Sequence, residues 1–481
     1  MSKFSFVATL FFSFEFIISC KNNRQEEFPN ILLIVADDMG QDMRCYGDTI
    51  ANTPNLDRLA NENVLFENAY VTTASCSPSR SSILTGLYPH QNGQIGLSHH
   101  GFNMHKAYQN IASVAKEKDY TTGLLGKLHV KPFNSFPFDY TVSIDFPLDT
   151  HLKGGYNHDS VTVIEIDGTK HKAKVKYAQT IKRVADSADV FFSRLDNDPF
   201  FLMVNFLDPH HPFYDQIEGF PQEIISASEV VHSRYSFSSD KKNTAGYYNG
   251  ISRIDIGYGM LEQLLKEKGL FENTLIIFLG DHGAPFEGAK MTCYELGLRV
   301  PMIVKFPFQQ YTGRYASEVS SLDIFPTILK YLSFAPEEEL PGYPMQDIIE
   351  GKTTRDLVYG EFNFHGSAYI NPVRSLKKGN YKIIVNYLSR YYNSLDYTTV
   401  KDESNASMAK EFGNKPTYEL YDLAEDPYEE DNLAQDTSRH ELLTRMIQEL
   451  ETYQKKVNDT LISPEGMAYF KDMINQQVLN E

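Results

Sequence analysis

Cys76 is the residue of this chain best placed for nucleophilic chemistry, and it opens the run CSPSRSSILTG at residues 76–86. A proline two positions later is typical of the first turn of a helix, predicted here over residues 78–84 with Cys76 on the loop before it. Backbone N–H groups and the positive end of the helix dipole favour a bound anion at such a start. The structural alternative is a buried thiol beside a helix, the commonest place for a lone cysteine.

Polar residues follow five of the apolar runs that are typical of strands. In an open α/β sheet, ligands bind at the carboxyl ends of the strands, so these residues are expected to share one site. The runs are ILLIVA, VLFENAYVTTAS, TTGLLG, FFLMVNF and LIIFLG. The residues that follow them are Asp37, Asp38, Cys76, Lys127, His129, Asp208, His210, Asp281 and His282.

Asp37, Asp38, Asp281 and His282 form a candidate site for one divalent cation. Adjacent aspartates on a regular strand point to opposite faces, but at a strand end the backbone turns and both can reach one ion. A histidine nitrogen is less typical of calcium than an oxygen, so Mg²⁺ and Mn²⁺ stay open beside Ca²⁺. The alternative for the aspartate pair alone is a helix cap or a solvated turn.

Five basic or imidazole side chains are candidates for a pocket that binds an anion with charge on several oxygens. A locally basic pocket is needed because the whole chain carries a formal net charge of -18. Singly, the lysines would more often be solvated on the surface, and the histidines would as readily be structural. The five are Arg80, Lys127, His129, His210 and Lys290.

Composition excludes several classes of partner and fold. A net charge of -18 over 481 residues argues against nucleic acid and anionic membrane surfaces, because both would be repelled at long range. The four cysteines, at positions 20, 45, 76 and 293, are too few and too scattered for a disulfide framework. None of them has the spacing of zinc ligands.

Residues 1–20 are predicted to be a signal peptide. Lys3 precedes an apolar run shorter than a membrane span, and Glu15 interrupts that run. Residues 17–20, IISC, resemble a bacterial lipobox, which would make Cys20 an acylated residue and residues 21–27 a tether. We therefore expect export, either to the periplasm or as a membrane-anchored lipoprotein of a bacterium, with no membrane contact besides the anchor.

The order of apolar runs and amphipathic stretches from Asn30 onward is typical of an α/β fold. The catalytic domain is predicted over residues 28–370. Tyrosine-rich alternating segments then predict a C-terminal subdomain at 371–481, a small antiparallel sheet with one covering helix. Strands are predicted at 30–36, 64–71, 122–126, 199–206, 274–279 and 381–387. Helices are predicted at 53–61, 78–84, 108–118, 181–195, 246–268, 322–332 and 439–455.

The pentapeptide CSPSR at 76–80 resembles the signature of the sulfatase family, which continues here through Thr85 and Gly86. Other segments stand in family order, namely DD at 37–38, GKLH at 126–129, DPH at 208–210, DH at 281–282 and ELYDL at 419–423. The resemblance covers nearly all of the chain after the signal peptide. It implies an alkaline phosphatase-like fold, a large, mixed, mostly parallel sheet sandwiched by helices, with a smaller C-terminal antiparallel sheet and helix.

The same resemblance implies the cofactors. Cys76 would be oxidised to Cα-formylglycine by a formylglycine-generating or sulfatase-maturating enzyme, and the aldehyde hydrate would be the nucleophile. One divalent cation, usually Ca²⁺ in this family, would be held by the two DD/DH pairs and by residue 76 itself.

The resemblance further implies a role for each pocket residue. Lys127 and Lys290 would hold the sulfo oxygens, and Arg80 would fix the loop and the hydrate. The leaving amine or alcohol needs a proton, for which His210 is the first choice of general acid and Lys290 the second. His129 would deprotonate the remaining hydroxyl so that sulfate is expelled.

Within the family, the segments at 76–97, 126–140 and 371–384 are most similar to sulfamidases, the heparan N-sulfatases. This implies a sulfated glycan substrate, in particular the N-sulfate of a terminal glucosamine in heparin or heparan sulfate. His282 departs from the group, whose members often have asparagine there. Loop histidines are often merely exposed, but several residues are candidate sugar contacts. They are His99, His100, His105, Asp208, His365 and Arg374.

Three other functions stay open. The first is a glucosamine 6-O-sulfatase or another glycan exo-O-sulfatase with the same catalytic core. The second is a phosphonate or phosphate ester hydrolase, since related enzymes share the formylglycine and the metal site. The third is a glycan-binding lipoprotein without catalysis, which an unmodified Cys76 would favour.

Overall fold

The computed structural model describes residues 28–143, 161–166, 169–174, 180–196, 198–211, 213, 225–232, 235, 241–366, 370–395 and 410–480. The signal peptide predicted at 1–20 and the tether at 21–27 lie outside these residues. None of the helices within these ranges combines the length and the hydropathy that a bilayer crossing requires.

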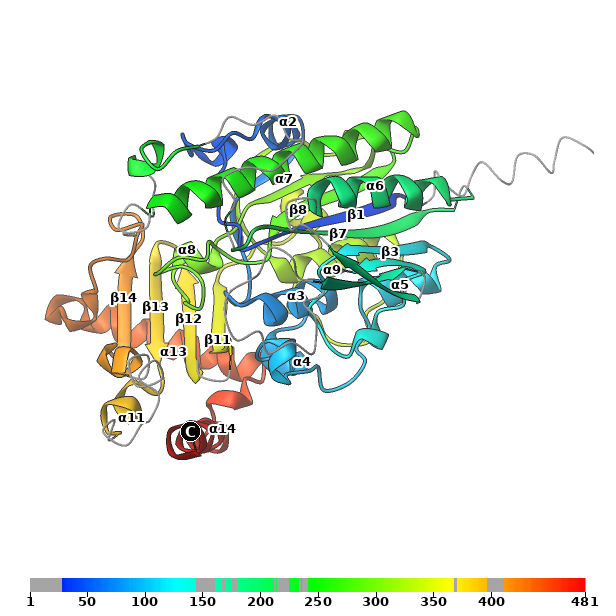
Figure 1. Cartoon of the computed structure of the whole chain (residues 1–481). Helices are drawn as coiled ribbons and strands as arrows, with labels where there is room; N and C mark the ends of the chain where they lie inside the picture. Colours follow the sequence, from blue (N-terminus) through cyan, green and yellow to red (C-terminus); the bar gives the residue numbers. More distant parts are fainter. Residues whose placement is uncertain are drawn as a thin grey trace, which may run out of the picture.

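An eight-stranded sheet forms the centre of the molecule (Figure 1). Its strand order is β10-β2-β9-β8-β1-β7-β3-β4, and all neighbours pair in parallel except those of β9. The sheet is therefore mixed and mostly parallel, as the resemblance implies. Its strands are β1 (Asn30–Asp37), β2 (Val64–Tyr70), β3 (Thr121–Gly126), β4 (Tyr140–Ser143), β7 (Phe200–Pro209), β8 (Thr274–Gly280), β9 (Met302–Lys305) and β10 (Gly313–Ser320). A separate hairpin joins β5 (Val161–Ile166) and β6 (Thr169–Lys174).

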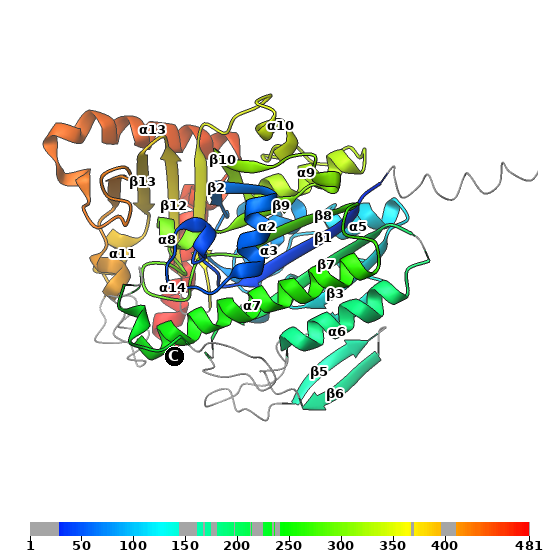
Figure 2. The ribbon, with the colours of Figure 1, turned by 90° about the horizontal axis from the view of Figure 1, so that it is seen from above.

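Helices cover both faces of this sheet (Figures 1 and 2). Every residue of β1 is buried, because Leu32 and Ile34 pack on the side of α2, α6 and α7 while Ile31 and Leu33 pack on the side of α3, α5 and α9. The helices of the main domain are α2 (Pro54–Glu62), α3 (Cys76–Thr85), α4 (Pro89–Asn92), α5 (Ile111–Glu117), α6 (Thr180–Ser193), α7 (Lys241–Glu267), α8 (Glu295–Leu298), α9 (Ile324–Tyr331) and α10 (Met345–Ile349).

A second, antiparallel sheet of four strands carries the C-terminal part of the chain. One of its faces packs on α13 through Leu376 and Ile383, and the opposite face, with Ile384, packs on the main domain. The sheet begins at Val358, ahead of the predicted boundary at 371, and more helices than the one predicted pack on it. The elements are β11 (Val358–Phe364), β12 (Ile370–Lys378), β13 (Tyr381–Asn386), α11 (Ser389–Asn393), β14 (Tyr418–Asp422), α13 (His440–Lys456) and α14 (Pro464–Asn480).

Most predicted elements lie where the sequence placed them, with ends that differ by a few residues. The predicted helix at 322–332 is a 3-10 turn, Ser321–Asp323, followed by α9, and α7 begins before residue 246. The strands β9 and β10 were not predicted. β9 is buried and mostly apolar but has only four residues, too short to mark a strand, and β10 is largely polar with no apolar run.

Candidate active site

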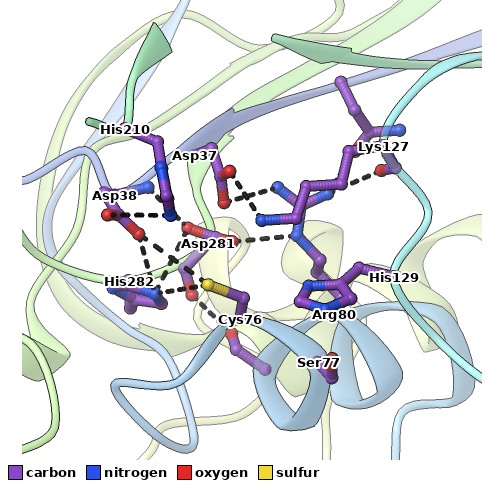
Figure 3. A network of polar contacts seen from close by, with 12 residues as sticks. Asp37, Asp38, Cys76, Ser77, Arg80, Lys127, His129, His210, Asp281 and His282 are labelled. Atoms are coloured by element: carbon purple, nitrogen blue, oxygen red, sulfur yellow. Dashed lines mark hydrogen bonds and ion pairs between the residues drawn. The ribbon is translucent and has the colours of Figure 1, made fainter. Parts of the chain in front are cut away.

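Cys76 is the first residue of α3 and not, as predicted, a residue of the loop before it. Ser75 has an extended backbone (φ −146°, ψ 131°), so the helix starts directly at Cys76, whose position at the helix N-terminus lies at the positive end of the helix dipole. The sulfur lies 3.3 Å from Nε2 of His282 and 3.8 Å from Oδ1 of Asp38 (Figure 3). The thiol thus faces the acidic cluster at a helix start.

The adjacent aspartates converge because the chain turns between them. Asp37 is the last residue of β1, whereas Asp38 has a left-handed backbone with φ 64°. The backbone N–H of Asp38 donates to Oδ1 of Asp281 at 2.9 Å, which joins the ends of β1 and β8. Three buried carboxylates therefore meet at this edge of the sheet, as the strand-end argument predicted.

Arg80 ties the carboxylates together from one turn further along α3. Its Nε donates to Oδ2 of Asp281 at 2.9 Å, and its Nη2 donates to Oδ1 of Asp37 at 3.2 Å. Its Nη1 donates to the carbonyl of Lys127 and to Oδ1 of Asn205, both at 2.8 Å. The guanidinium is fully buried, and its N–H donors bind the carboxylates and thereby orient them.

Lys127 and Lys290 neutralise one aspartate each. Nζ of Lys127 donates to Oδ2 of Asp37 at 2.7 Å, and Nζ of Lys290 lies 2.8 Å from both oxygens of Asp38. Burial alone would raise the pKa of Asp37, but Lys127 and Arg80 outweigh it and hold that pKa well below its usual value. Burial opposes Lys290 in the same way at Asp38, and the pKa of Asp38 is again lowered.

Asp281 and His282 both have pKa values above their usual range. Burial raises the pKa of Asp281, and His282 and Arg80 offset this only in part. Burial alone would lower the pKa of His282, but Asp281 foremost raises it to about 9. Nδ1 of His282 lies 2.9 Å from the carbonyl of Gly283 and donates to it, which leaves Nε2 directed at Asp38, 3.1 Å away.

This arrangement fits a divalent cation. Asp38, Cys76 and His282 form one group, and Asp37, Cys76 and Asp281 another, whose ligand atoms lie within 4.8 Å of one another. Burial raises the pKa of Asp281 more than His282 and Arg80 lower it, so a bound cation would further favour the charged carboxylate. His282 presents Nε2 with its other nitrogen anchored to a carbonyl, the orientation that metal-ligating histidines have.

His129 and His210 lie on opposite sides of the cluster (Figure 3). Nε2 of His129 lies 2.8 Å from Nδ1 of His99, and the two rings stack at 5.1 Å. Nε2 of His210 lies 3.8 Å from Oδ2 of Asp38, while its Nδ1 contacts the carbonyl of His211 at 2.6 Å. Burial lowers the pKa of His210 to about 4 and that of His129 well below its usual value, so both rings are neutral at pH 7.

The candidate sugar contacts fall into different places. Nδ1 of His365 lies 3.1 Å from Oγ of Ser75, directly over the start of α3. His100 is exposed, and its ring leans on that of His99 at 4.4 Å, at the margin of the cluster. His105 is also exposed and has no contact with the cluster among those observed. Of the predicted set, His365 and the His99–His100 pair are therefore the ones that lie beside the site.

Asp208 and Arg374 are structural rather than open to a sugar. Both oxygens of Asp208 accept from Arg253, at 3.0 and 2.6 Å, which anchors the end of β7 to α7. Arg374 is fully buried in the C-terminal sheet, where it donates to Asp459, Asn363 and backbone carbonyls. The prediction that Arg374 contacts a sugar is wrong, because its donors are all directed into the protein interior.

Two residues of the site were missed by the sequence reasoning. Asn205 accepts from Arg80, and it is the single polar residue in the run FFLMVNF, a signal that was available. Ser79 donates through Oγ to the backbone carbonyl of Asp281 at 2.5 Å. A serine in a serine-rich helix start gives no separate signal.

The fold and the cluster at the start of α3 agree with a family assignment. The chain belongs to the sulfatase family, whose family model, described as Sulfatase, matches residues 29–334. A second model, described as N-sulphoglucosamine sulphohydrolase, C-terminal, matches residues 280–411. The protein is therefore an enzyme that hydrolyses sulfate esters or a sulfamate, and its family generally uses formylglycine and a divalent metal.

Individual relatives cover almost the whole chain. Human N-sulphoglucosamine sulphohydrolase is 27% identical, over 91% of this chain and 92% of its own length. An ulvan-active sulfatase of Formosa agariphila is 28% identical, over 94% and 86%. A protein solved in complex with its substrate D-glucosamine-2-N,6-O-disulfate has a TM-score of 0.68 at 21% identity, over 91% of this chain and 99% of that one.

Proposed function

We propose that this enzyme removes the N-sulfate of a terminal glucosamine in heparin or heparan sulfate. The observation that carries this substrate is the match of residues 280–411 to the C-terminal model of N-sulphoglucosamine sulphohydrolases. The similarity to the human enzyme over 91% of the chain supports it. The match includes β11, β12 and β13 of the C-terminal sheet, and His365, which directly follows β11, contacts Ser75 at the start of α3.

The catalytic centre we propose needs two additions to the chain. Asp37, Asp38, Asp281 and His282 would hold Ca²⁺, beside residue 76 oxidised to Cα-formylglycine. These groups supply charge neutralisation at the sulfo oxygens and an aldehyde hydrate as nucleophile. The side chains of the protein itself bind the sulfo group and transfer the protons.

The chain binds the sulfo group from three directions. Lys127 and Lys290 bring ammonium groups to the cluster, and the N-terminus of α3 adds backbone N–H groups. Charge on the sulfo oxygens persists through the transition state, so donors fixed before the reaction stabilise it without reorganisation. Arg80 holds Asp37 and Asp281 in place for this arrangement.

Proton transfer to the leaving amine is assigned to His210, with Lys290 as the second candidate. His210 is neutral in the substrate-free site, because burial holds its pKa at about 4. An arriving sulfo group adds negative charge close to Nε2 and thereby favours the protonated ring. Lys290 is already protonated, since Asp38 outweighs burial and raises its pKa.

His129 is assigned the final deprotonation that expels sulfate. Burial is the main cause that lowers its pKa, and Lys127 adds to the effect, so the ring is an unprotonated base at neutral pH. Its contact with His99 orients the ring.

The deciding experiment is an activity assay on a panel of sulfated glucosamines. The mature protein is made in a host that installs formylglycine. We expect sulfate release from N-sulfoglucosamine and none from the 6-O-sulfated, N-acetylated sugar. Release from the 6-O-sulfate alone would instead establish the second candidate, a 6-O-sulfatase. That candidate is favoured by the similarity to a protein whose substrate carries both a 2-N- and a 6-O-sulfate.

The nucleophile and the acid are tested with two variants. Cys76→Ala should abolish turnover and leave the melting temperature within a few degrees of the parent; substantial remaining activity would reject Cys76 as the nucleophile.

His210→Gln should slow the turnover of N-sulfoglucosamine far more than that of an activated aryl sulfate, because only the amine needs a proton to leave. Equal losses of turnover on both substrates would argue against His210 as the general acid and favour Lys290.

We further propose export of the protein and acylation of Cys20 after cleavage. The lipobox-like IISC at 17–20 supports this. Mass spectrometry of the native N-terminus, compared with a Cys20→Ala variant, tests it: the parent should carry a lipid on residue 20, and an unlipidated terminus would refute the anchor.

A further inference from the structure

A basic cavity of about 440 Å³ lies between α13, the segment that leads into β11, and the end of β12. This volume is within the range of about 300–1,000 Å³ that small-molecule sites occupy. Positions 445, 449, 452 and 456 line it along one face of α13, as their spacing of three and four residues requires. Its charged lining residues are Arg355, Asp356, Lys378, Arg445, Glu449 and Lys456.

The cations of this cavity are only partly balanced. Lys378 pairs with Glu449 at 2.8 Å, and Arg355 pairs with the buried Asp323. Arg445 makes no observed ion pair with the described residues, and the closest observed partner of Lys456 is the ring of Tyr453, 5.8 Å away. The cavity therefore keeps positive charge on a chain whose net charge is -18.

Arg355 adds positive charge at the wall of the cavity. Its side chain is only 5% exposed and pairs with the buried Asp323, so it lies behind the more accessible cations. Its guanidinium also lies over the ring of Tyr343, 5.2 Å from the centroid, and Tyr343 lines the cavity as well.

The cavity is separate from the candidate active site. It shares no lining residue with the cluster around Cys76. The C-terminal sheet lies between them: Ile383 packs towards α13, whereas its neighbour Ile384 packs towards Ala74, on the segment that leads to Cys76. One sugar residue therefore cannot fill both places.

We propose that this cavity is a second binding site for sulfated glycan, in which Arg445 and Lys456 contact sulfate or carboxylate groups, Arg355 adds positive charge behind them, and Tyr343 and Tyr453 pack on the sugar. Cations beside aromatic rings suit a charged sugar better than a bare inorganic ion, which would use only the charges. The choice of glycan as the anion rests on the proposed function. The site would hold a long chain on the enzyme while the active site works on an end.

The test measures binding of a heparin hexasaccharide to Cys76→Ala protein by calorimetry at low salt, with N-sulfoglucosamine saturating the active site. Hexasaccharide binding should persist in the presence of this monosaccharide. The pair Arg445→Gln and Lys456→Gln should weaken it by more than about tenfold, because a single lost charge-assisted hydrogen bond already costs about that much. In protein with native residue 76, the same pair should leave turnover of N-sulfoglucosamine unchanged.

The matched control is the pair Arg439→Gln and Lys455→Gln, which removes the same two charges at or next to α13 but outside the cavity. It should leave the affinity within twofold. Loss of hexasaccharide binding on adding the monosaccharide, or equal affinities of the cavity and control pairs, would overturn the second site. Failure of the proposed function is seen separately, as absent turnover of the monosaccharide by the parent enzyme.

Discussion

Three buried carboxylates, two lysines, an arginine and a histidine form a network of ion pairs beside Cys76. Its charges are not neutralised in separate pairs, because several members have two partners. Asp37 contacts both Arg80 and Lys127, and Asp281 contacts both Arg80 and His282. Charges buried together depend on every partner, because removing one leaves the others unpaired in a medium of low polarity. At the scale of the residue, the site is a network and not a set of independent groups.

Arg80→Met tests this network through stability. The substitution keeps the length of the side chain but leaves Asp37 and Asp281 without their guanidinium, so we expect a loss of about 3–5 kcal/mol in the free energy of unfolding. Denaturant titration measures it. The control is Lys182→Met, which removes one partner of an exposed pair with Asp186 and should cost less than about 0.5 kcal/mol. Similar losses in both variants would refute the network.

At the scale of the element, the site depends on how closely β3 approaches β7. Gly126 ends β3 with φ 91°, and a Cβ there would lie 2.0 Å from the carbonyl oxygen of Asn205. Asn205 binds Arg80, and Lys127 follows directly, so the close contact of these strands places two site residues at once.

Gly126→Ala should therefore lower both stability and turnover. Gly47→Ala is the matched control, because Gly47 has φ 93° but nothing within 4 Å of the added Cβ. The control should lose only the roughly 1–2 kcal/mol that a left-handed backbone costs an alanine, with turnover kept. Equal stability and equal turnover of the two variants would show that the strand contact is not needed.

A second element-scale feature joins α4 to the C-terminal sheet. Nδ1 of His90 lies 2.6 Å from Oε2 of Glu361 on β11, and its Nε2 lies 3.1 Å from the carbonyl of Val457 at the end of α13. Both ring nitrogens face acceptors, so the ring is held as an imidazolium. Burial alone would lower the pKa of His90, but Glu361 foremost raises it.

This pair predicts a loss of stability at alkaline pH. A raised pKa in the folded state means that the contribution is complete below the unfolded pKa of about 6.5 and is lost as the pH rises through the folded pKa. The free energy of unfolding of the parent should therefore exceed that of His90→Gln at pH 6, and the difference should shrink as the pH rises. A difference that stays constant from pH 6 to pH 9 would contradict the imidazolium.

At the scale of the whole molecule, metal binding should appear as folding stability. A ligand that binds only the folded state stabilises it by about 2.7 kcal/mol at one hundred times its dissociation constant. Adding Ca²⁺ to EDTA-dialysed protein should raise the melting temperature, and Asp38→Asn should abolish the shift. The exposed-site control Asp186→Asn should keep it. A calcium shift of equal size in Asp38→Asn would place the ion elsewhere.

The sequence by itself determined the α/β fold and most of the cluster. The runs ILLIVA and LIIFLG are long enough to be buried strands, and the carboxyl ends of parallel strands meet at one edge, so Asp37, Asp38, Asp281 and His282 were expected at one edge of the sheet. These are local rules, and they need no tertiary information.

Tertiary structure alone decided which polar residues are open to a ligand. Arg374 and Asp208 have the residue types of sugar contacts, but Asp459 and Arg253, distant in the chain, occupy them. The strand β10 forms at the edge of the sheet by pairing with β2, and the four-residue β9 forms in the space between β2 and β8, so pairing with neighbours rather than their own pattern decides both. Hydrogen-bond partners far apart in sequence are set by packing, and no local rule of periodicity or spacing encodes them.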